Sequence, residues 1–144
     1  MSNTSVLVVD DDMAICRIVQ EMLAKEEFDV QISQSVADAL QVIEEKLFGI
    51  YLLDFKLQDG SGLDVVELIR SKRSAAPIVL MSGYDSSAFA LRAQKLRITH
   101  FLQKPFSSAT VCDAVKHAAT STSVLSQSVE QKRHQAILHF LSKF

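Results

Sequence analysis

Four short runs of apolar residues constrain the fold most, because each run is continuous rather than alternating. They cover residues 6–9, 50–53 and 78–81 and, more weakly, 99–102. Such a run is typical of a strand that is buried on both faces of a sheet. Residues 28–32 alternate between apolar and polar side chains, which predicts a further strand near an edge of the sheet.

Segments with the apolar spacing of helices lie between and after these strands. They cover residues 13–25, 35–46, 62–72, 86–96 and 107–119. The strand and helix patterns therefore alternate five times, which predicts an α/β fold with a parallel sheet and helices on both of its faces. In folds of this class, ligands bind at the carboxyl ends of the strands, where the strand order reverses.

The pattern changes after about residue 120. Residues 120–128 are rich in Ser and Thr and predict a connector, and the apolar residues that follow recur at the spacing of a short amphipathic helix. We expect a domain over residues 1–120 and a connector with a helix over 121–144. A linker to a further domain is the favoured interpretation of this tail; a docking or dimerising helix and a simple extension stay open.

Charge and hydropathy exclude several classes of function. The net charge of −2 provides no basic surface for a phosphate backbone, so we expect no direct contact with nucleic acid. No apolar run approaches the roughly 18 residues that a membrane span needs, and the start of the chain lacks the features of a signal peptide. We expect a cytoplasmic protein with no membrane contact, in which Cys16 and Cys112 are buried or half-buried free thiols.

Polar residues follow four of the predicted strands, so all of them are expected at one rim of the sheet. They are Asp10, Asp11 and Asp12 after the first strand, Asp54 after the third, Ser82 after the fourth and Lys104 after the fifth.

Three carboxylates at one rim, those of Asp10, Asp11 and Asp54, cannot all stay ionised without a compensating charge. Oxygen ligands favour a hard divalent cation, Mg²⁺ or Mn²⁺, whose open positions suit a phosphoryl group. Lys104 and Ser82 supply the positive charge and the hydroxyl that phosphoryl transfer to an aspartate needs. A single Asp at a strand end is usually a helix cap, so the combination carries the argument rather than any one residue.

The motifs VVDDD, LLDFKLQDGSGLDV, VLMSG and HFLQKPF resemble, in this order and spacing, the receiver domains of two-component signalling. The resemblance covers roughly residues 4–120 and includes Gly62, eight residues after Asp54. It implies a flavodoxin-like (βα)5 fold with a central parallel sheet of strand order 2-1-3-4-5, to which this chain adds a C-terminal helical extension.

The resemblance also implies a role for each residue at the rim. Asp54 is expected to accept a phosphoryl group from a sensor histidine kinase or a phosphotransfer protein. Asp11 would bind Mg²⁺ directly, Asp10 would assist, partly through water, and the backbone carbonyl of Lys56 would be a further ligand. Such a protein is not an enzyme for other substrates, because it catalyses only its own phosphorylation and dephosphorylation.

Further residues are expected to relay the signal. Ser82 and Lys104 would bind the phosphoryl oxygens, and Phe101 takes the place of the aromatic switch residue. The sequence leaves the oligomeric state open; a homodimer would form either through the face of the fourth helix, fifth strand and fifth helix or through the C-terminal helix. The kinase would dock on the start of the first helix, at Met13, Ala14 and Ile15, and on the loop at Pro105 and Phe106.

Three positions depart from the pattern of the family. Gln58 replaces the usual Pro, so the loop after Asp54 is expected to be less rigid. Arg97 replaces a Gly before the fifth strand, which predicts a turn of another shape, since positive φ costs a side chain about 1 kcal/mol. Phe101 lacks a tyrosine hydroxyl, so any switching there would act through packing alone.

Lys56 and Tyr84 would flank the path of a hydrolytic water, and we hypothesise that they slow dephosphorylation. The alternative, that both side chains lie in solvent, stays open. The four histidines show no spacing typical of a metal site and are interpreted as surface or interface residues.

Three other functions compete with a phosphorylated receiver. A haloacid-dehalogenase-type phosphatase needs a second Asp two residues after the nucleophile, where this chain has Lys56. A flavin-binding electron carrier needs a phosphate loop after the first strand, where carboxylates would repel the phosphate. A degenerate receiver that acts as a phosphorylation-independent interaction module is not favoured, because every expected site position holds a suitable residue.

Overall fold

The computed structural model describes residues 4–83, 90–98, 100–104 and 107–121. Its centre is a five-stranded parallel sheet of order β2-β1-β3-β6-β7. The strands are β1 (Thr4–Val9), β2 (Phe28–Ser33), β3 (Ile50–Asp54), β6 (Ile78–Ser82) and β7 (His100–Gln103). This order is the predicted one, in which the third, fourth and fifth strands of the sheet are β3, β6 and β7.

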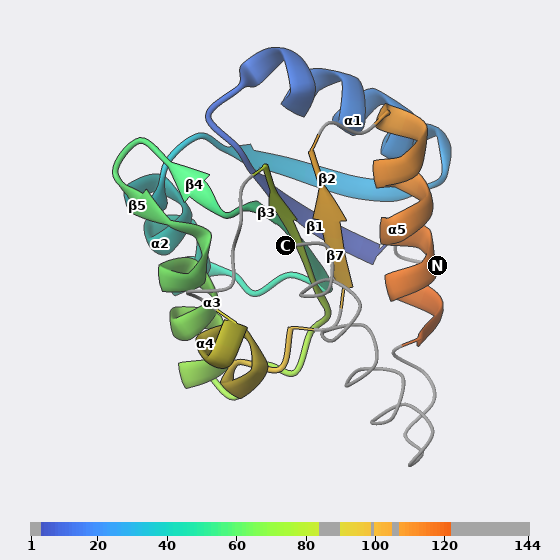
Figure 1. Ribbon diagram of the computed structural model, residues 1–144. Coiled ribbons are helices and arrows are strands. Elements are labelled where there is room, and N and C mark those ends of the chain that lie inside the picture. Colours follow the sequence, from blue (N-terminus) through green and yellow to red (C-terminus); the bar gives the residue numbers. More distant parts are fainter. Residues whose placement is uncertain (1–3, 84–89, 99, 105–106, 122–144) are drawn as a thin grey trace.

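Helices cover both faces of the sheet (Figure 1). They are α1 (Met13–Lys25), α2 (Val36–Glu45), α3 (Gly62–Ser71), α4 (Ala90–Lys95) and α5 (Ser108–Ser121). Helices α1 and α5 pack on one face, and α2, α3 and α4 lie on the other. The flavodoxin-like fold expected from the sequence is therefore confirmed for the described residues, which do not include the tail at 122–144.

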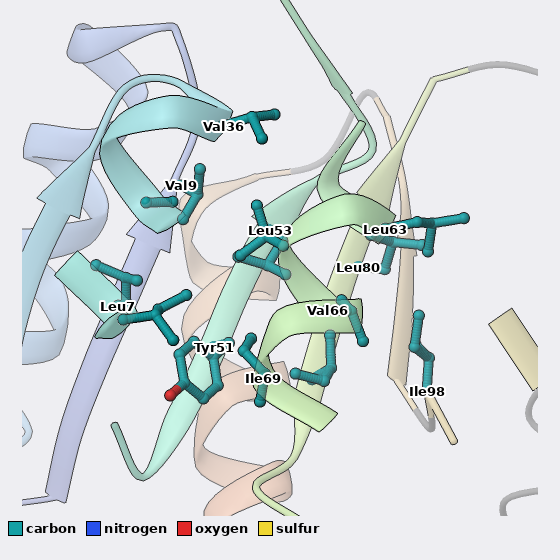
Figure 2. Packing of buried hydrophobic residues seen from close by; sticks show 14 of the residues in the cluster. Leu7, Val9, Val36, Tyr51, Leu53, Leu63, Val66, Ile69, Leu80 and Ile98 are labelled. Carbon is teal, nitrogen blue, oxygen red and sulfur yellow. The ribbon is translucent and has the colours of Figure 1, made fainter. Parts of the chain in front are cut away.

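The continuous apolar runs are buried on both faces, as their sequence pattern predicts. Every residue of β3 and β6 is buried, whereas β2 at the edge of the sheet alternates between exposed and half-buried residues until its end. Side chains of one sheet face pack against α2 and α3 in a buried hydrophobic cluster (Figure 2). The members of this cluster that Figure 2 labels are Leu7, Val9, Val36, Tyr51, Leu53, Leu63, Val66, Ile69, Leu80 and Ile98. This core holds the strand ends in place and so fixes the rim.

A short antiparallel hairpin follows Asp54, although the sequence predicts only a loop there. Its strands are β4 (Lys56–Leu57) and β5 (Gly60–Ser61). The hairpin leads directly into α3, which begins at Gly62. Strands this short carry no periodic signal that could predict them.

The turn before β7 corrects an expectation. Arg97 has a φ of 59°, the left-handed conformation that a Gly usually provides, so the turn keeps its shape despite the side chain. Two hydrogen bonds fix it, from the Ile98 amide to the Ala93 carbonyl at 3.2 Å and from the Arg97 amide to the Gln94 carbonyl at 3.0 Å. This pattern is a Schellman motif, and its bonds offset the cost of the positive φ.

Two further expectations concern the cysteines and membranes. Cys16 lies on α1 and Cys112 on α5, and both are buried free thiols, as predicted. Within the part of the chain that the structure describes, no helix combines the length and the apolar character that crossing a bilayer requires.

Candidate functional site

The carboxylates of Asp10, Asp11 and Asp54 converge at the carboxyl ends of β1 and β3. These strands are neighbours in the sheet, and one carboxylate oxygen of each residue lies within 4.8 Å of the others. Asp10 and Asp54 are buried and Asp11 is half-buried. The structure thus brings together the three acidic residues that the sequence places at one rim.

Asp10 gives the strongest indication of a cation site. Its Oδ1 accepts a hydrogen bond from the Asp12 amide at 3.0 Å, while its buried Oδ2 has no hydrogen-bond partner. Burial, together with the charges of Asp54 and Asp11, raises the pKa of Asp10 to about 6, although the Asp12 amide and Lys104 act against the rise. A buried carboxylate oxygen without a hydrogen bond is costly, and a divalent cation would compensate for it.

Lys104 links the acidic cluster to β7. Its Nζ lies 2.9 Å from Asp54 Oδ2 and 4.0 Å from Asp10 Oδ2. Burial favours the neutral amine, but the hydrogen bond to Asp54 and the nearby carboxylates outweigh it and raise the pKa of Lys104. The Lys104 ammonium is therefore charged and holds the Asp54 carboxylate in place.

Ser82 ends β6, which lies between β3, the strand that ends with Asp54, and β7, the strand that Lys104 follows. The residue is buried, and its backbone carbonyl accepts a hydrogen bond from the Lys104 amide at 2.8 Å. The next residue, Gly83, lies beside the aliphatic part of the Lys104 side chain, because a Cβ on Gly83 would be 3.6 Å from Lys104 Cβ. The rim thus brings the segment at Ser82 beside Lys104.

Gly62 lies directly against the backbone of Asp54. Its amide donates to the Phe55 carbonyl at 2.8 Å, and a Cβ at this position would collide with the Asp54 carbonyl oxygen. Only glycine allows this close approach of two backbone segments. From the sequence, Gly62 was noted only for its distance of eight residues from Asp54, and the structure shows the steric reason why a glycine is needed there.

Asp59 anchors the hairpin after Asp54, a role that sequence reasoning missed. Its carboxylate accepts hydrogen bonds from the amides of Val36 at 2.8 Å and Ala37 at 3.0 Å, at the start of α2. These two bonds lower the pKa of Asp59. They supply a restraint on the loop in spite of Gln58, and the Asp-Gly pair at a turn is the signal that could have suggested a capping role.

Asp12, the third residue of the acidic run, has a different role. Its Oδ1 accepts hydrogen bonds from the amides of Ala14 at 3.0 Å and Ile15 at 3.3 Å, so it caps α1. Below the cluster, Cys16 Sγ donates to the Asp10 carbonyl at 3.4 Å. Burial and the nearby carboxylates raise the pKa of Cys16 to about 12, so the thiol stays neutral.

The remaining predicted residues lie around the rim or beyond the described part of the chain. Phe101 is half-buried on β7 and packs against the core on the α3 side, and Lys56 is exposed on β4. Of the docking residues, Met13 and Ile15 are half-buried and Ala14 is exposed. Tyr84, Pro105 and Phe106 lie outside the residues that the structure describes.

Two of the histidines are neighbours, which the sequence does not predict. The ring centroids of His100 on β7 and His117 on α5 are 5.6 Å apart in an edge-to-face contact. The acidic cluster is nevertheless the one group of three or more potential metal ligands among the described residues. The histidines in the tail, His134 and His139, lie outside them.

Comparison with known proteins decides the family. The family model for the response regulator receiver domain matches residues 6–116. The chain belongs to the response regulator receiver domain family. The matched region covers β1 from residue 6, the other four strands of the sheet and the whole acidic cluster.

Curated relatives of this receiver domain are longer regulatory proteins. The photosynthetic apparatus regulatory protein RegA of Rhodobacter capsulatus is 32% identical over 79% of this chain and 62% of its own length. The acid tolerance regulatory protein ActR of Rhizobium meliloti is 37% identical over 70% of this chain and 52% of its own length. The chain therefore spans a little over half the length of these relatives.

Solved receiver domains share the fold at lower identity. A CheY-like response regulator receiver domain protein from Methanospirillum hungatei JF-1 matches with a TM-score of 0.74 and 22% identity, over 93% of this chain and 99% of that one. The receiver domain of the Francisella response regulator 1452 matches with a TM-score of 0.72 and 22% identity, over 83% of this chain and 99% of that one. These likenesses support the fold.

Proposed function

We propose that this receiver domain is a phosphorylation-dependent signalling switch in which Asp54 accepts the phosphoryl group. One observation carries the proposal: the buried Asp54 carboxylate lies within a cluster of acidic groups and 2.9 Å from the Lys104 ammonium. A nucleophile for phosphoryl transfer needs positioning and nearby charge, and this arrangement offers both.

The residues present fit a divalent cation, Mg²⁺ or Mn²⁺. Asp10, Asp11 and Asp54 would hold it, with the Lys56 carbonyl as a further ligand. The buried Asp10 Oδ2, which has no hydrogen-bond partner, supports this assignment. When bound, the cation supplies positive charge that offsets the carboxylates and the arriving phosphoryl group.

The transfer step itself needs little from the protein beyond geometry. An Asp54 carboxylate oxygen forms a bond to phosphorus while the bond from phosphorus to the donor's imidazole nitrogen breaks, and that nitrogen keeps the electron pair. Lys104 now holds Asp54 Oδ2 and would shift to a phosphoryl oxygen, while the Ser82 hydroxyl would donate to another. The product carries about −1.5 to −2 charges on Asp54.

The switch follows from this change of charge. Movement of Ser82 would free space for the half-buried Phe101 ring and repack the face of α4, β7 and α5. A shift from about 1:99 to 99:1 between two states needs roughly 5.5 kcal/mol, and several charge-assisted hydrogen bonds at the phosphoryl group can supply it.

The partner in this proposal is a sensor histidine kinase or a phosphotransfer protein that docks on the start of α1. The domain would then catalyse only its own phosphorylation and dephosphorylation. Because the curated relatives are longer than the region that they share with this chain, we propose that the signal passes to an output segment outside that region, with the tail at 121–144 as the linker. We also propose that Lys56 and Tyr84 flank the path of the hydrolytic water and so slow the dephosphorylation of Asp54.

The proposal is tested by incubating the chain with acetyl phosphate and Mg²⁺ and mapping the modified residue by mass spectrometry. We expect a phosphoryl adduct on Asp54 that EDTA prevents and that is lost in Asp54→Asn. The matched control is Asp12→Asn, which keeps an equally good helix cap and should be modified like the wild type. An unmodified wild type, or a main adduct on another residue, would overturn the proposal.

A further inference from the structure

Helix α4 is attached to the domain by a different chemistry from its neighbour α3. Five residues of α3 are buried, whereas α4 buries one, Ala93. Leu91, the large apolar side chain of α4, is 73% exposed. Apolar burial therefore contributes little to the position of α4, and polar contacts must contribute more.

The Arg92 side chain joins the first half of α4 to α3, which lies beside it in Figure 1. Arg92 Nη2 lies 2.8 Å from Asp64 Oδ1 and 2.8 Å from Glu67 Oε1, and its Nε donates to the same Glu67 oxygen at 2.9 Å. Asp64 and Glu67 are three residues apart and so share one face of α3. The hydrogen bond to Arg92 lowers the pKa of Asp64, so the pair is ionised at neutral pH.

A second guanidinium fastens the other end of α4. Arg70, near the end of α3, donates to the carbonyls of Leu96 at 2.8 Å and Arg97 at 3.3 Å, which follow the last turn of α4. It also donates to Ser74 at 3.0 Å and Ala76 at 2.8 Å. The next residue of the turn, Ile98, is fully buried in the core.

The two ends differ in how they respond to salt. The Arg92 side chain is 38% exposed and its partners Asp64 and Glu67 are 45% and 53% exposed, so dissolved ions screen their attraction. The Arg70 end rests on hydrogen bonds to neutral carbonyls and on the burial of Ile98, which ions screen much less. The Arg92 end is thus the weaker attachment.

The weaker end is also connected to the acceptor loop. Asp64 Oδ2 accepts the Ser61 amide at 3.2 Å, while the Ser61 hydroxyl accepts the Leu63 amide at 3.1 Å in the capping box of α3. Between them, Gly62 lies on the Asp54 carbonyl. One carboxylate therefore contacts both α4 and the turn that supports Asp54.

We propose that Arg92, Asp64 and Glu67 form a salt-sensitive latch that fixes α4 against α3, and that α4 releases from this end while Arg70 retains the other. A helix of six residues is not stable by itself, so release would expose the α4 amides to solvent. That the released state is favoured by phosphorylation rests on the proposed function of Asp54. We take the released state to be the more reactive one, so opening the latch would raise the rate of Asp54 phosphorylation in proportion to the population of that state.

The latch is tested by amide hydrogen exchange in the unphosphorylated full chain, with Arg92→Gln as the main variant. We expect the amides at α4, such as that of Leu96 just after the helix, which donates to the Arg92 carbonyl at 3.0 Å, to exchange roughly threefold to fivefold faster than in the wild type at low salt. At about 1 M salt the wild type should approach the variant, because the Debye length falls to about 3 Å. Arg92→Lys keeps the positive charge but loses the guanidinium that contacts both carboxylates, so its exchange rate should lie between those of the wild type and Arg92→Gln.

The matched control is Lys72→Gln, which removes an ion pair of the same kind, 2.9 Å from Glu44 and away from α4. It should leave α4 exchange unchanged. A double-mutant cycle of Arg92→Gln with Glu67→Gln isolates the pair, and the two changes should be less than additive. Equal exchange in wild type and Arg92→Gln, or an equal effect of Lys72→Gln, would overturn the latch.

The link to phosphorylation is measured separately, by the rate of Asp54 labelling with acetyl phosphate. We expect Arg92→Gln to be labelled roughly threefold faster than the wild type, and Lys72→Gln at the wild-type rate. If Arg92→Gln speeds exchange but not labelling, the link is wrong and the latch stands. If no variant is labelled at all, the proposed function of Asp54 fails instead.

Discussion

Helices α3 and α4 lie side by side on one face of the sheet, yet they are held in opposite ways. Helix α3 buries five residues and begins on the backbone of Asp54, whereas α4 buries Ala93 and is held by two guanidinium groups. In the proposed function, this contrast separates a rigid side, which carries the phosphoryl acceptor Asp54, from a side that responds to phosphorylation. A switch needs both, because the nucleophile must be placed firmly while the output surface must have two positions of similar free energy.

The largest expected effect is a difference in stability between matched truncations on the two helices. Ile69→Ala on α3 removes a fully buried side chain and should lower the free energy of unfolding by about 3 kcal/mol. Leu91→Ala on α4 should change it by less than about 0.5 kcal/mol, because Leu91 is largely exposed. Urea denaturation measures both, and similar losses would break the contrast between the helices.

The next effect tests the close approach at the start of α3. Gly62→Ala forces a methyl group into the Asp54 carbonyl and should cost about 1–3 kcal/mol of stability, with slower phosphorylation of Asp54. Gly83→Ala is the control glycine at the same rim, where a Cβ meets only ordinary contacts with Lys104. Thermal unfolding should separate the two variants. A Gly62→Ala protein as stable as Gly83→Ala would contradict the account of the acceptor side.

The smallest effect concerns pH and the charged anchor of the acceptor loop. Hydrogen bonds from the starting amides of α2 lower the pKa of Asp59, so its stabilising effect is present above the unfolded pKa and is lost as the pH falls through the folded one. Asp59→Ala should therefore have a lower Tm than the wild type at neutral pH. The difference should shrink in acid, as thermal melts across pH would show.

A Tm gap between Asp59→Ala and the wild type that stays constant into acid would argue against a charge-dependent anchor. Asp59→Asn, which keeps one acceptor oxygen, should lie between the two at neutral pH. The size of the Tm difference shows how much this anchor contributes to the firm placement of the loop between Asp54 and α3.

Local sequence patterns were sufficient to predict the sheet and the meeting of the acidic residues. Runs such as 50–53 and 78–81 are continuous because both faces of a central strand are buried, and parallel strands bring their carboxyl ends to one rim. Asp54 and Asp10 could therefore be expected near each other without any knowledge of side-chain geometry.

Contacts between residues distant in sequence could not be predicted. The Asp59 anchor and the Arg92 latch each join residues more than twenty positions apart, and many surface charges offer the same local pattern without a partner. The conformation of Arg97 was wrongly predicted, because its positive φ is supported by the Schellman bonds and by Arg70, on another helix. Local propensity does not register such tertiary support.

The central claim, that one cleft formed by Asp10, Asp11, Asp54 and Lys104 binds the cation and the phosphoryl group, is tested most directly by NMR with Mg²⁺ and beryllofluoride. The account predicts large amide shifts at Asp10, Asp54 and Lys104 in the wild type, together with shifts along α4. Asp54→Asn should show none of the beryllofluoride effects. Shifts confined to other parts of the chain, or a response of Asp54→Asn equal to that of the wild type, would contradict it.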